Sequence, residues 1–295
     1  MNATMNSQTQ TFNHLLPLDF DNVSTLPDSH AWSTTTFPSD DSCHHPIDGG
    51  EPLPPVIDIG EPVPSSAAVL AAHGTEAACC TAPSGATGYG LTRISPFFPK
   101  LMWSEGFGMM GSPEEHDRQL WPQDHAKFCE LMEQWQAEMK TLCEKIVGMM
   151  LCSLGLTDEE DMKWFEPISG CDGTQCVLQL NSYPSNINGL QVYKDGVGWV
   201  GIEPVEGALV VNVGDLMHIV SNGQFKSVLH RAVVNKTCHR VSTAFFYGTP
   251  WDAKVSPLKK LVDSDHPPLY RPVKWKEYLQ IKKTDFSSAL ESIRL

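Results

Sequence analysis

Residues 190–202 are Leu-Gln-Val-Tyr-Lys-Asp-Gly-Val-Gly-Trp-Val-Gly-Ile, two short runs of β-branched and aromatic residues on either side of an Asp-Gly turn. This pattern predicts a β-hairpin. Similar runs, separated by turns that contain Gly, Asn, Asp or Pro, continue on both sides of it. They are Val177–Tyr183, Leu190–Tyr193, Trp199–Ile202, Ala208–Val213, Leu216–Val220, Ser227–Val234 and Arg240–Tyr247. Strands at this close spacing predict an antiparallel sandwich or barrel.

A helical period precedes this β-rich region. Between residues 123 and 154, apolar residues recur at alternating steps of four and three, which places them on one face of an α-helix. They are Phe128, Met132, Trp135, Met139, Leu142, Ile146 and Met149. Thr157-Asp-Glu-Glu160 predicts the capping box of a second helix, and a last helix is predicted over Tyr278–Leu295. We expect the methionine-rich face in the core, with a soft binding surface as the alternative.

The composition changes toward the N-terminus. Residues 1–52 are rich in Ser, Thr, Asp, Asn and Pro, which predicts a loosely ordered arm. Pro54–Gly60 predicts a short strand, whereas residues 61–90 contain few large apolar side chains and predict a linker. The expected divisions are the arm 1–52, a helical region 53–165 with the weak linker 61–90, a truncated β domain 166–270 and a helical tail 271–295.

The charge of the 295-residue chain is acidic and uneven. Its 21 Lys and Arg against 35 Asp and Glu give −14, and no Lys or Arg precedes Arg93. Without a basic cluster the chain is a poor candidate for nucleic acid, and without a basic, apolar leader it is a poor candidate for secretion or organelle import. No apolar run approaches the length of a membrane span. We therefore expect a cytoplasmic protein with reduced cysteines that binds neither nucleic acid nor membrane, and its oligomeric state stays open.

Two short motifs in the β region are suited to chemistry. Arg240-Val-Ser242 begins a predicted strand, in which alternate side chains share a face, so a guanidinium and a hydroxyl can bind one carboxylate. Asn181 and Tyr183 form a similar pair on their own strand. His230 lies in the apolar run Ser227–Val234, where a histidine is more often a hydrogen-bonded core residue than a metal ligand. On the residues alone, His230 can be either a hydrogen-bonded core residue or a metal ligand.

Several segments together resemble the C-terminal half of plant 2-oxoglutarate/Fe(II)-dependent dioxygenases. They are Asn188–Gly196, Gly207–Asp215, Ser221–Gly223, His230–Asn235 and Arg240–Ser242. Three further segments narrow the resemblance to gibberellin 3-beta-dioxygenases: Leu26–Trp32, Arg93–Gly106 and Ser256–Val262. The resemblance covers most of residues 15–60 and nearly all of 88–295. The resemblance implies a double-stranded β-helix (jelly-roll) core flanked by helices, an α+β, mainly β fold.

The resemblance also implies a reaction and the residues that serve it. The family oxidises a C–H bond while it converts 2-oxoglutarate and O₂ into succinate and CO₂, here with 3β-hydroxylation of gibberellin precursors in hormone biosynthesis. Fe(II) is held by two histidines and one carboxylate, and ascorbate is expected as a reductant. On this resemblance His230 is the distal histidine ligand. Arg240 and Ser242 hold the far carboxylate of 2-oxoglutarate, with Tyr183 assisting and Asn181 nearby.

The chain departs from the family pattern at two places. A His-x-Asp normally follows the Asn-x-Tyr-Pro strand, but here only Ser185-Asn-Ile187 separates Pro184 from Asn188, and none of the eleven histidines has Asp or Glu two residues later. The stretch 61–90 lacks the family's helix and aromatic-rich strand. His218 is expected in a buried or edge role rather than as a substitute ligand. We predict an incomplete jelly roll that binds iron weakly and turns over little, with a non-catalytic binding module or a truncated product without function as alternatives.

Overall fold

The computed structural model describes residues 88–91, 105–114, 125–156, 175–183, 189–233 and 240–295. The predicted arm, the strand at 54–60, most of the linker and the helix expected after Thr157 lie outside these residues.

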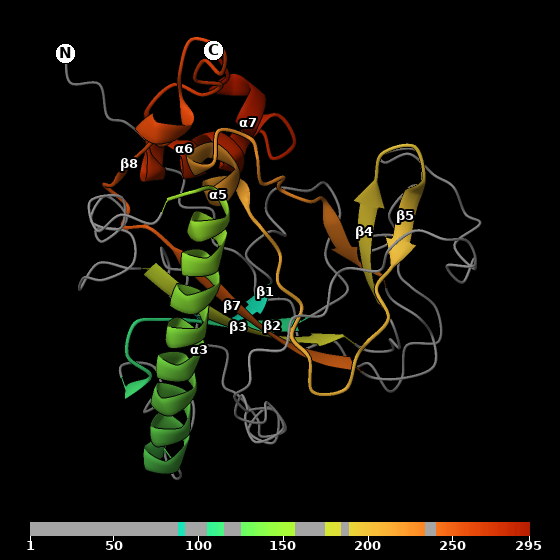
Figure 1. Cartoon of the computed structure of the whole chain (residues 1–295). Helices are drawn as coiled ribbons and strands as arrows, with labels where there is room; N and C mark the ends of the chain where they lie inside the picture. Colours follow the sequence, from blue (N-terminus) through green and yellow to red (C-terminus); the bar gives the residue numbers. More distant parts are fainter. Residues whose placement is uncertain (1–87, 92–104, 115–124, 157–174, 184–188, 234–239) are drawn as a thin grey trace, which may run out of the picture.

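A four-stranded antiparallel sheet lies beside the long helix (Figure 1). Its strands follow the order β1 (Gly88–Leu91), β2 (Glu105–Met110), β3 (Gln175–Tyr183) and β7 (Arg240–Gly248). β3 and β7 pair over their whole length, from Gln175 opposite Gly248 to Tyr183 opposite Arg240. Both strands were predicted from their β-branched and aromatic residues. Strand β1 begins inside the stretch predicted to be a linker, so the last three residues of that stretch belong to the sheet.

Helix α3 (His125–Ser153) confirms the predicted amphipathic helix. Part of the methionine-rich face is core, because four of its residues are buried and pack on Leu178 and Leu180 of β3. These four are Met132, Trp135, Met139 and Leu142. Met149, the last member of the predicted stripe, is 47% exposed, and Val147 and Leu151 are buried in its place. A repeat of 3.5 residues drifts around a helix of 3.6 residues per turn, which explains the shift at the far end.

The predicted hairpin forms as β4 (Leu190–Lys194) and β5 (Gly198–Gly201), joined at Asp195-Gly196. Gly196 has φ 80° and Gly198 has φ 96°, in the left-handed region that the tight turn requires of glycine. β4 also pairs with β6 (His230–Ala232), giving a separate three-stranded sheet in the order β5-β4-β6.

Two predicted strands are wrong in the structure. Leu216–Val220 lies in the helix α5 (Asp215–Val220), which buries Met217, Ile219 and Val220. A short apolar run fits either period, and here the buried residues are spaced as on a helix face. Ala208–Val213 joins no sheet of the described residues and leads into α5 as irregular chain.

The predicted C-terminal helix is split into two. α6 (Trp275–Thr284) ends at Asp285, which is extended at φ −142° and ψ 90°, and α7 (Ala289–Ser292) follows. Asp285 Oδ1 accepts a hydrogen bond from the Ser288 N–H at 3.1 Å, a side-chain turn that competes with helix continuation. A short sheet of β8 (Lys254–Val255) and β9 (Val273–Lys274) and the 3-10 turn η4 (Lys259–Leu261) complete this region.

A second core lies where the C-terminal region meets α5 and the end of α3 (Figure 1). Its fully buried side chains include Tyr270, Tyr278, Ile219, Val220, Val255, Ile293 and Leu151. α3 therefore joins both cores. The described strands form three separate antiparallel sheets rather than one closed barrel.

Candidate functional site

Four of the five residues predicted to serve function lie together on β3 and β7. The register places Tyr183 opposite Arg240 and Asn181 opposite Ser242. Residues directly opposite in an antiparallel pair share a face, and so do alternate residues along a strand. All four therefore lie on one face, opposite the face on which Leu178 and Leu180 pack against α3. We call Asn181, Tyr183, Arg240 and Ser242 the β3–β7 fork.

The contacts within the fork position its charged group. The Arg240 guanidinium carbon lies 5.4 Å from the centroid of the Tyr183 ring, a cation–π distance. Asn181 is 7% exposed, and its Oδ1 accepts a hydrogen bond of 2.9 Å from Gln179 Nε2. Within the described part of the chain, no Asp or Glu forms an ion pair with Arg240. The fork therefore presents donors and a positive charge suited to a carboxylate.

A surface without side chains continues from the fork across β2 and β1. Gly106 lies opposite Asn181 and Gly108 opposite Gln179, while Gly90 and Gly88 pair with these two glycines in turn. All four glycines share the face of the fork, and we call them the glycine face. A ligand that touches this face meets backbone directly. This feature was not predicted, because only the strand register brings the two glycine pairs together.

The fifth predicted residue, His230, lies in the other sheet. It begins β6, pairs with Val192 and is exposed. Its Nδ1 donates to the Val228 carbonyl at 3.1 Å, which leaves Nε2 as the nitrogen that could bind a metal.

The residues that the structure describes do not fit an iron centre of the family type. Among the described residues, no group of three His, Cys, Asp or Glu could hold a metal ion. Over the whole sequence no His-x-Asp or His-x-Glu exists. A catalytic metal is normally held by at least three protein donors, and among the predicted site residues only His230 is of a type that binds iron.

His218 has a structural role, as expected. Its Nδ1 donates to the Phe225 carbonyl at 2.6 Å, and its Nε2 lies 2.8 Å from the Tyr270 hydroxyl. Both ring nitrogens are engaged, so the ring links α5 to the C-terminal region instead of binding a metal.

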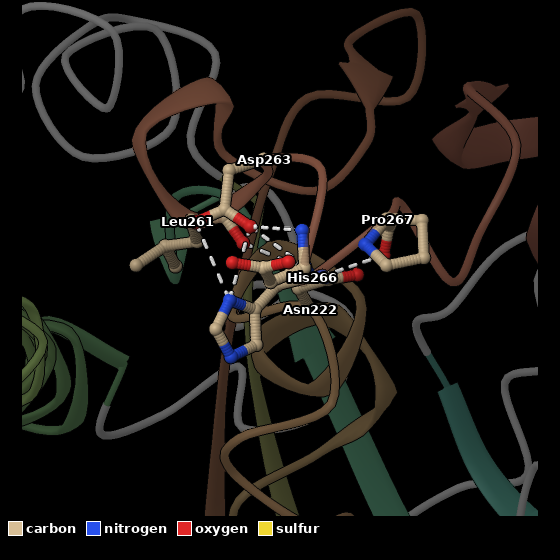
Figure 2. Close-up of polar contacts among 6 residues, drawn as sticks. Asn222, Leu261, Asp263, His266 and Pro267 are labelled. Atoms are coloured by element: carbon tan, nitrogen blue, oxygen red, sulfur yellow. Dashed lines mark hydrogen bonds and ion pairs between the residues drawn. The ribbon is translucent and has the colours of Figure 1, made fainter.

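Asn222 makes a second link to the same region (Figure 2). Its Nδ2 donates to the carbonyls of Pro267 at 3.1 Å and Leu261 at 3.4 Å, and its Oδ1 accepts from the Leu269 N–H at 2.8 Å. Its φ of 52° is left-handed, a conformation that asparagine tolerates. Nearby, Asp263 accepts from the His266 N–H at 2.7 Å, and this hydrogen bond lowers the pKa of the exposed carboxyl.

Asp215 makes a third, buried link. The Tyr278 hydroxyl donates to its Oδ2 at 2.5 Å, and Lys282 Nζ donates to the same oxygen. Burial alone would raise the pKa of Asp215, but Lys282, Tyr278 and Ser227 outweigh it and hold the pKa below its ordinary value. Burial raises the pKa of Tyr278 strongly, so its hydroxyl keeps its proton. These links were not predicted, because their partners lie up to 67 positions apart in the sequence.

Cys143, Cys152 and Cys176 are free thiols. Burial, with smaller effects from Cys176 and Glu144, raises the pKa of Cys143 to about 12, and burial also raises that of Cys176. Both thiols therefore stay protonated at neutral pH and are weak nucleophiles and metal ligands.

Comparison with known proteins defines the family. The family model described as the 2OG-Fe(II) oxygenase superfamily matches residues 170–249, which contain the fork and His230. Gibberellin 3-beta-dioxygenase 3 of Arabidopsis thaliana is 39% identical, and the match covers 98% of this chain and all of that protein. The alignment spans 361 positions, more than the 295 residues of this chain, so that relative has positions with no counterpart here. Gibberellin 3-beta-dioxygenase 1 of Pisum sativum is 46% identical over 72% of this chain and 63% of its own length.

Solved structures agree on the fold. The crystal structure of JOX2 in complex with 2OG, Fe and JA is 28% identical and has a TM-score of 0.60 over 71% of this chain and 70% of its own. The rice dioxygenase for auxin oxidation, at 24% identity, covers 72% of this chain and 77% of its own with a TM-score of 0.57, which supports the fold alone. The predicted jelly-roll class, incomplete and flanked by helices, is thus confirmed.

Among the described residues, none of the helices combines the length and the apolar composition of a membrane span. The family acts on small-molecule substrates and uses Fe(II) and 2-oxoglutarate. With 39% identity over the full length of one relative and 46% over most of this chain in another, the chain belongs to the gibberellin 3-beta-dioxygenases of the 2OG-Fe(II) oxygenase superfamily.

Proposed function

We propose that this chain binds 2-oxoglutarate and a gibberellin precursor, and that it performs the 3β-hydroxylation of its family with little or no turnover. One observation carries the proposal: the fork for a carboxylate is intact, whereas the residues that the structure describes contain no set of three metal ligands. The names of the relatives suggest the substrate class.

The fork supports 2-oxoglutarate as the first ligand. An arginine guanidinium matches a carboxylate with two parallel hydrogen bonds, and the Ser242 hydroxyl on the same face adds a third donor. Tyr183 lies against the guanidinium and restricts its orientation, while Asn181 borders the site. We assign Arg240 and Ser242 to the far carboxylate of 2-oxoglutarate.

The glycine face supports the precursor as the second ligand. Gibberellin precursors have a rigid, largely apolar ring skeleton, which packs best on a surface that it can approach closely. Gly106 lies directly opposite Asn181 of the fork and Gly108 lies opposite Gln179 beside it, and neither presents a side chain to such a skeleton. The two ligands would then lie on adjacent parts of one sheet face.

The low turnover follows from the ligand count. We propose that His230 is the remaining iron ligand and that one such donor holds Fe(II) too weakly for sustained reaction. Ascorbate as reductant and a cytoplasmic location also belong to this proposal. A second candidate, a binding module without chemistry, is favoured by the same intact fork and differs only in having no turnover.

A binding experiment tests the ligand assignment. The purified full chain is titrated with 2-oxoglutarate by calorimetry in the presence of a metal chelator. We expect saturable binding that Arg240→Gln weakens at least about tenfold, since a hydrogen bond to a charged group contributes about 1.5–3 kcal/mol. The matched control is Arg271→Gln, which removes an exposed guanidinium 3.0 Å from Glu277 and is expected to bind normally. Equal binding by both variants would show that the fork is not the site.

An activity assay then separates the two candidate functions. Succinate release is measured with Fe(II), 2-oxoglutarate, ascorbate and a gibberellin precursor, beside the full-length Arabidopsis relative. Slow release that depends on the precursor supports the weak enzyme, and binding without release supports the module. A rate equal to that of the relative would contradict the low turnover.

A further inference from the structure

The chain between β5 and α5 is unusually exposed for its composition. Leu209, Val210 and Val211 are 49%, 56% and 57% exposed. Since successive side chains of an extended chain point to opposite sides, an extended segment here is apolar on both faces. Figure 1 draws this connection as irregular chain rather than as an arrow. We call Ala208–Val213 the open segment.

Among the described residues, the backbone of the open segment makes a single hydrogen bond. Ala208 N–H closes a turn onto the Val205 carbonyl at 3.1 Å, and α5 begins after Gly214, which is extended at φ −100° and ψ −179°. Within the described ranges, Leu209–Val213 form no backbone hydrogen bond. Four of its six residues are Leu or Val, types that suit strands, and it contains neither Pro nor Gly. Such a segment is a template for strand pairing.

We propose that the open segment pairs with the same segment of a second copy of this chain, in an open-ended intermolecular β-sheet. Within the described residues, no backbone hydrogen bond occupies either side of Leu209–Val213, so each copy can accept one neighbour on each side. A single six-residue strand pair buries far less than the roughly 1,200 Å² of a stable specific interface, which favours successive addition over a closed dimer.

The distribution of charge supports the second copy as the partner. The whole chain carries −14, so most of its surface repels another copy. No charged residue lies between Glu206 and Asp215, and Asp215 is neutralised by Lys282. Two copies can therefore align their open segments without setting like charges opposite each other. Association should strengthen with salt, because the Debye length falls from about 10 Å at 0.1 M to about 3 Å at 1 M and screens the remaining repulsion.

Hydrogen exchange and sedimentation test the proposal on the full chain. We expect amides 209–213 to exchange fast at low protein concentration and slowly at high concentration, while the β4–β5 turn stays unchanged. Sedimentation should show species larger than 32.6 kDa that grow with protein and with salt. Strong protection of 209–213 in a monomer would mean that the chain covers its own segment, and a monomer at every concentration and salt would equally overturn the proposal.

Two variants separate strand pairing from general stickiness. Val210→Lys places like charges inside the paired segment and should raise the concentration for half-association at least about tenfold. Val197→Lys, at a position that is 61% exposed in the β4–β5 turn, should change it less than about twofold. Circular dichroism checks that both variants fold. Equal effects of the two variants would rule out the open segment as the interface.

Discussion

Replacing Asp215 with asparagine is expected to lower the free energy of unfolding by about 2–3 kcal/mol, since hydrogen bonds to a charged group contribute about 1.5–3 kcal/mol each. The side chain of Asp215 is 9% exposed and accepts from Tyr278 and Lys282, which anchor α6 to α5. The variant keeps the shape of the side chain but leaves the ammonium of Lys282 without its counter-charge. Breaking a fully buried pair costs about 3–5 kcal/mol. The estimate lies below that because Lys282 is 28% exposed and can be hydrated.

The assay is urea denaturation followed by circular dichroism, with an unchanged m value as evidence that only stability changed. The matched control is Asp252→Asn, which removes an exposed partner of Lys276 at 2.5 Å and should leave the free energy of unfolding nearly unchanged, because water screens an exposed ion pair. A loss below about 0.5 kcal/mol for Asp215→Asn, or equal losses for both variants, would refute the buried anchor.

The same comparison has a pH dependence with a definite sign. The pKa of Asp215 is lower in the folded chain than its ordinary value, so its charge stabilises the fold above the unfolded pKa of about 3.9. This contribution is lost as the pH falls through the folded pKa. The difference in stability between wild type and Asp215→Asn should therefore be full near pH 7 and shrink below about pH 4.

Three further predictions concern the core, a thiol and the glycine face. Leu178→Ala should cost about 2–5 kcal/mol in urea denaturation, because Leu178 is 1% exposed against α3, and a cost below about 1 kcal/mol would contradict that packing. At pH 8, peptide mapping should show Cys143 alkylated far more slowly than the exposed Cys152, with a rate that rises toward its pKa of about 12; equal rates would contradict the burial. Gly106→Val should weaken precursor binding in equilibrium dialysis at least about tenfold without weakening 2-oxoglutarate binding, whereas a Gly201→Val control should leave both unchanged.

Local sequence patterns predicted the elements whose secondary structure is determined by residues close together in the sequence. The seven apolar residues from Phe128 to Met149 predicted α3, and the Asp195-Gly196 turn predicted the β4–β5 hairpin. Strand alternation predicted that Asn181 and Tyr183 share a face, as do Arg240 and Ser242. That the two pairs are neighbours depends on the β3–β7 register, which joins segments about 60 residues apart and has no local signal.

Tertiary contacts decided the parts that the sequence could not predict. Leu216–Val220 has a β-like composition, yet its apolar residues become helical because Met217, Ile219 and Val220 fill the second core. The break at Asp285 depends on one side-chain turn inside an otherwise helical pattern. The absence of a His-x-Asp motif, in contrast, is evident from the sequence without any structure.

An anaerobic titration of the purified full chain with Fe(II) and 2-oxoglutarate tests the central claim, that the carboxylate fork is retained while the iron ligand set is not. The visible charge-transfer absorption of the iron–2-oxoglutarate chelate is followed as Fe(II) is added. We predict no saturable band in this chain, and a band after a His-x-Asp segment is inserted behind Pro184. A saturable band in the unmodified chain that His230→Ala abolishes would contradict the claim, because other residues would then complete the iron site.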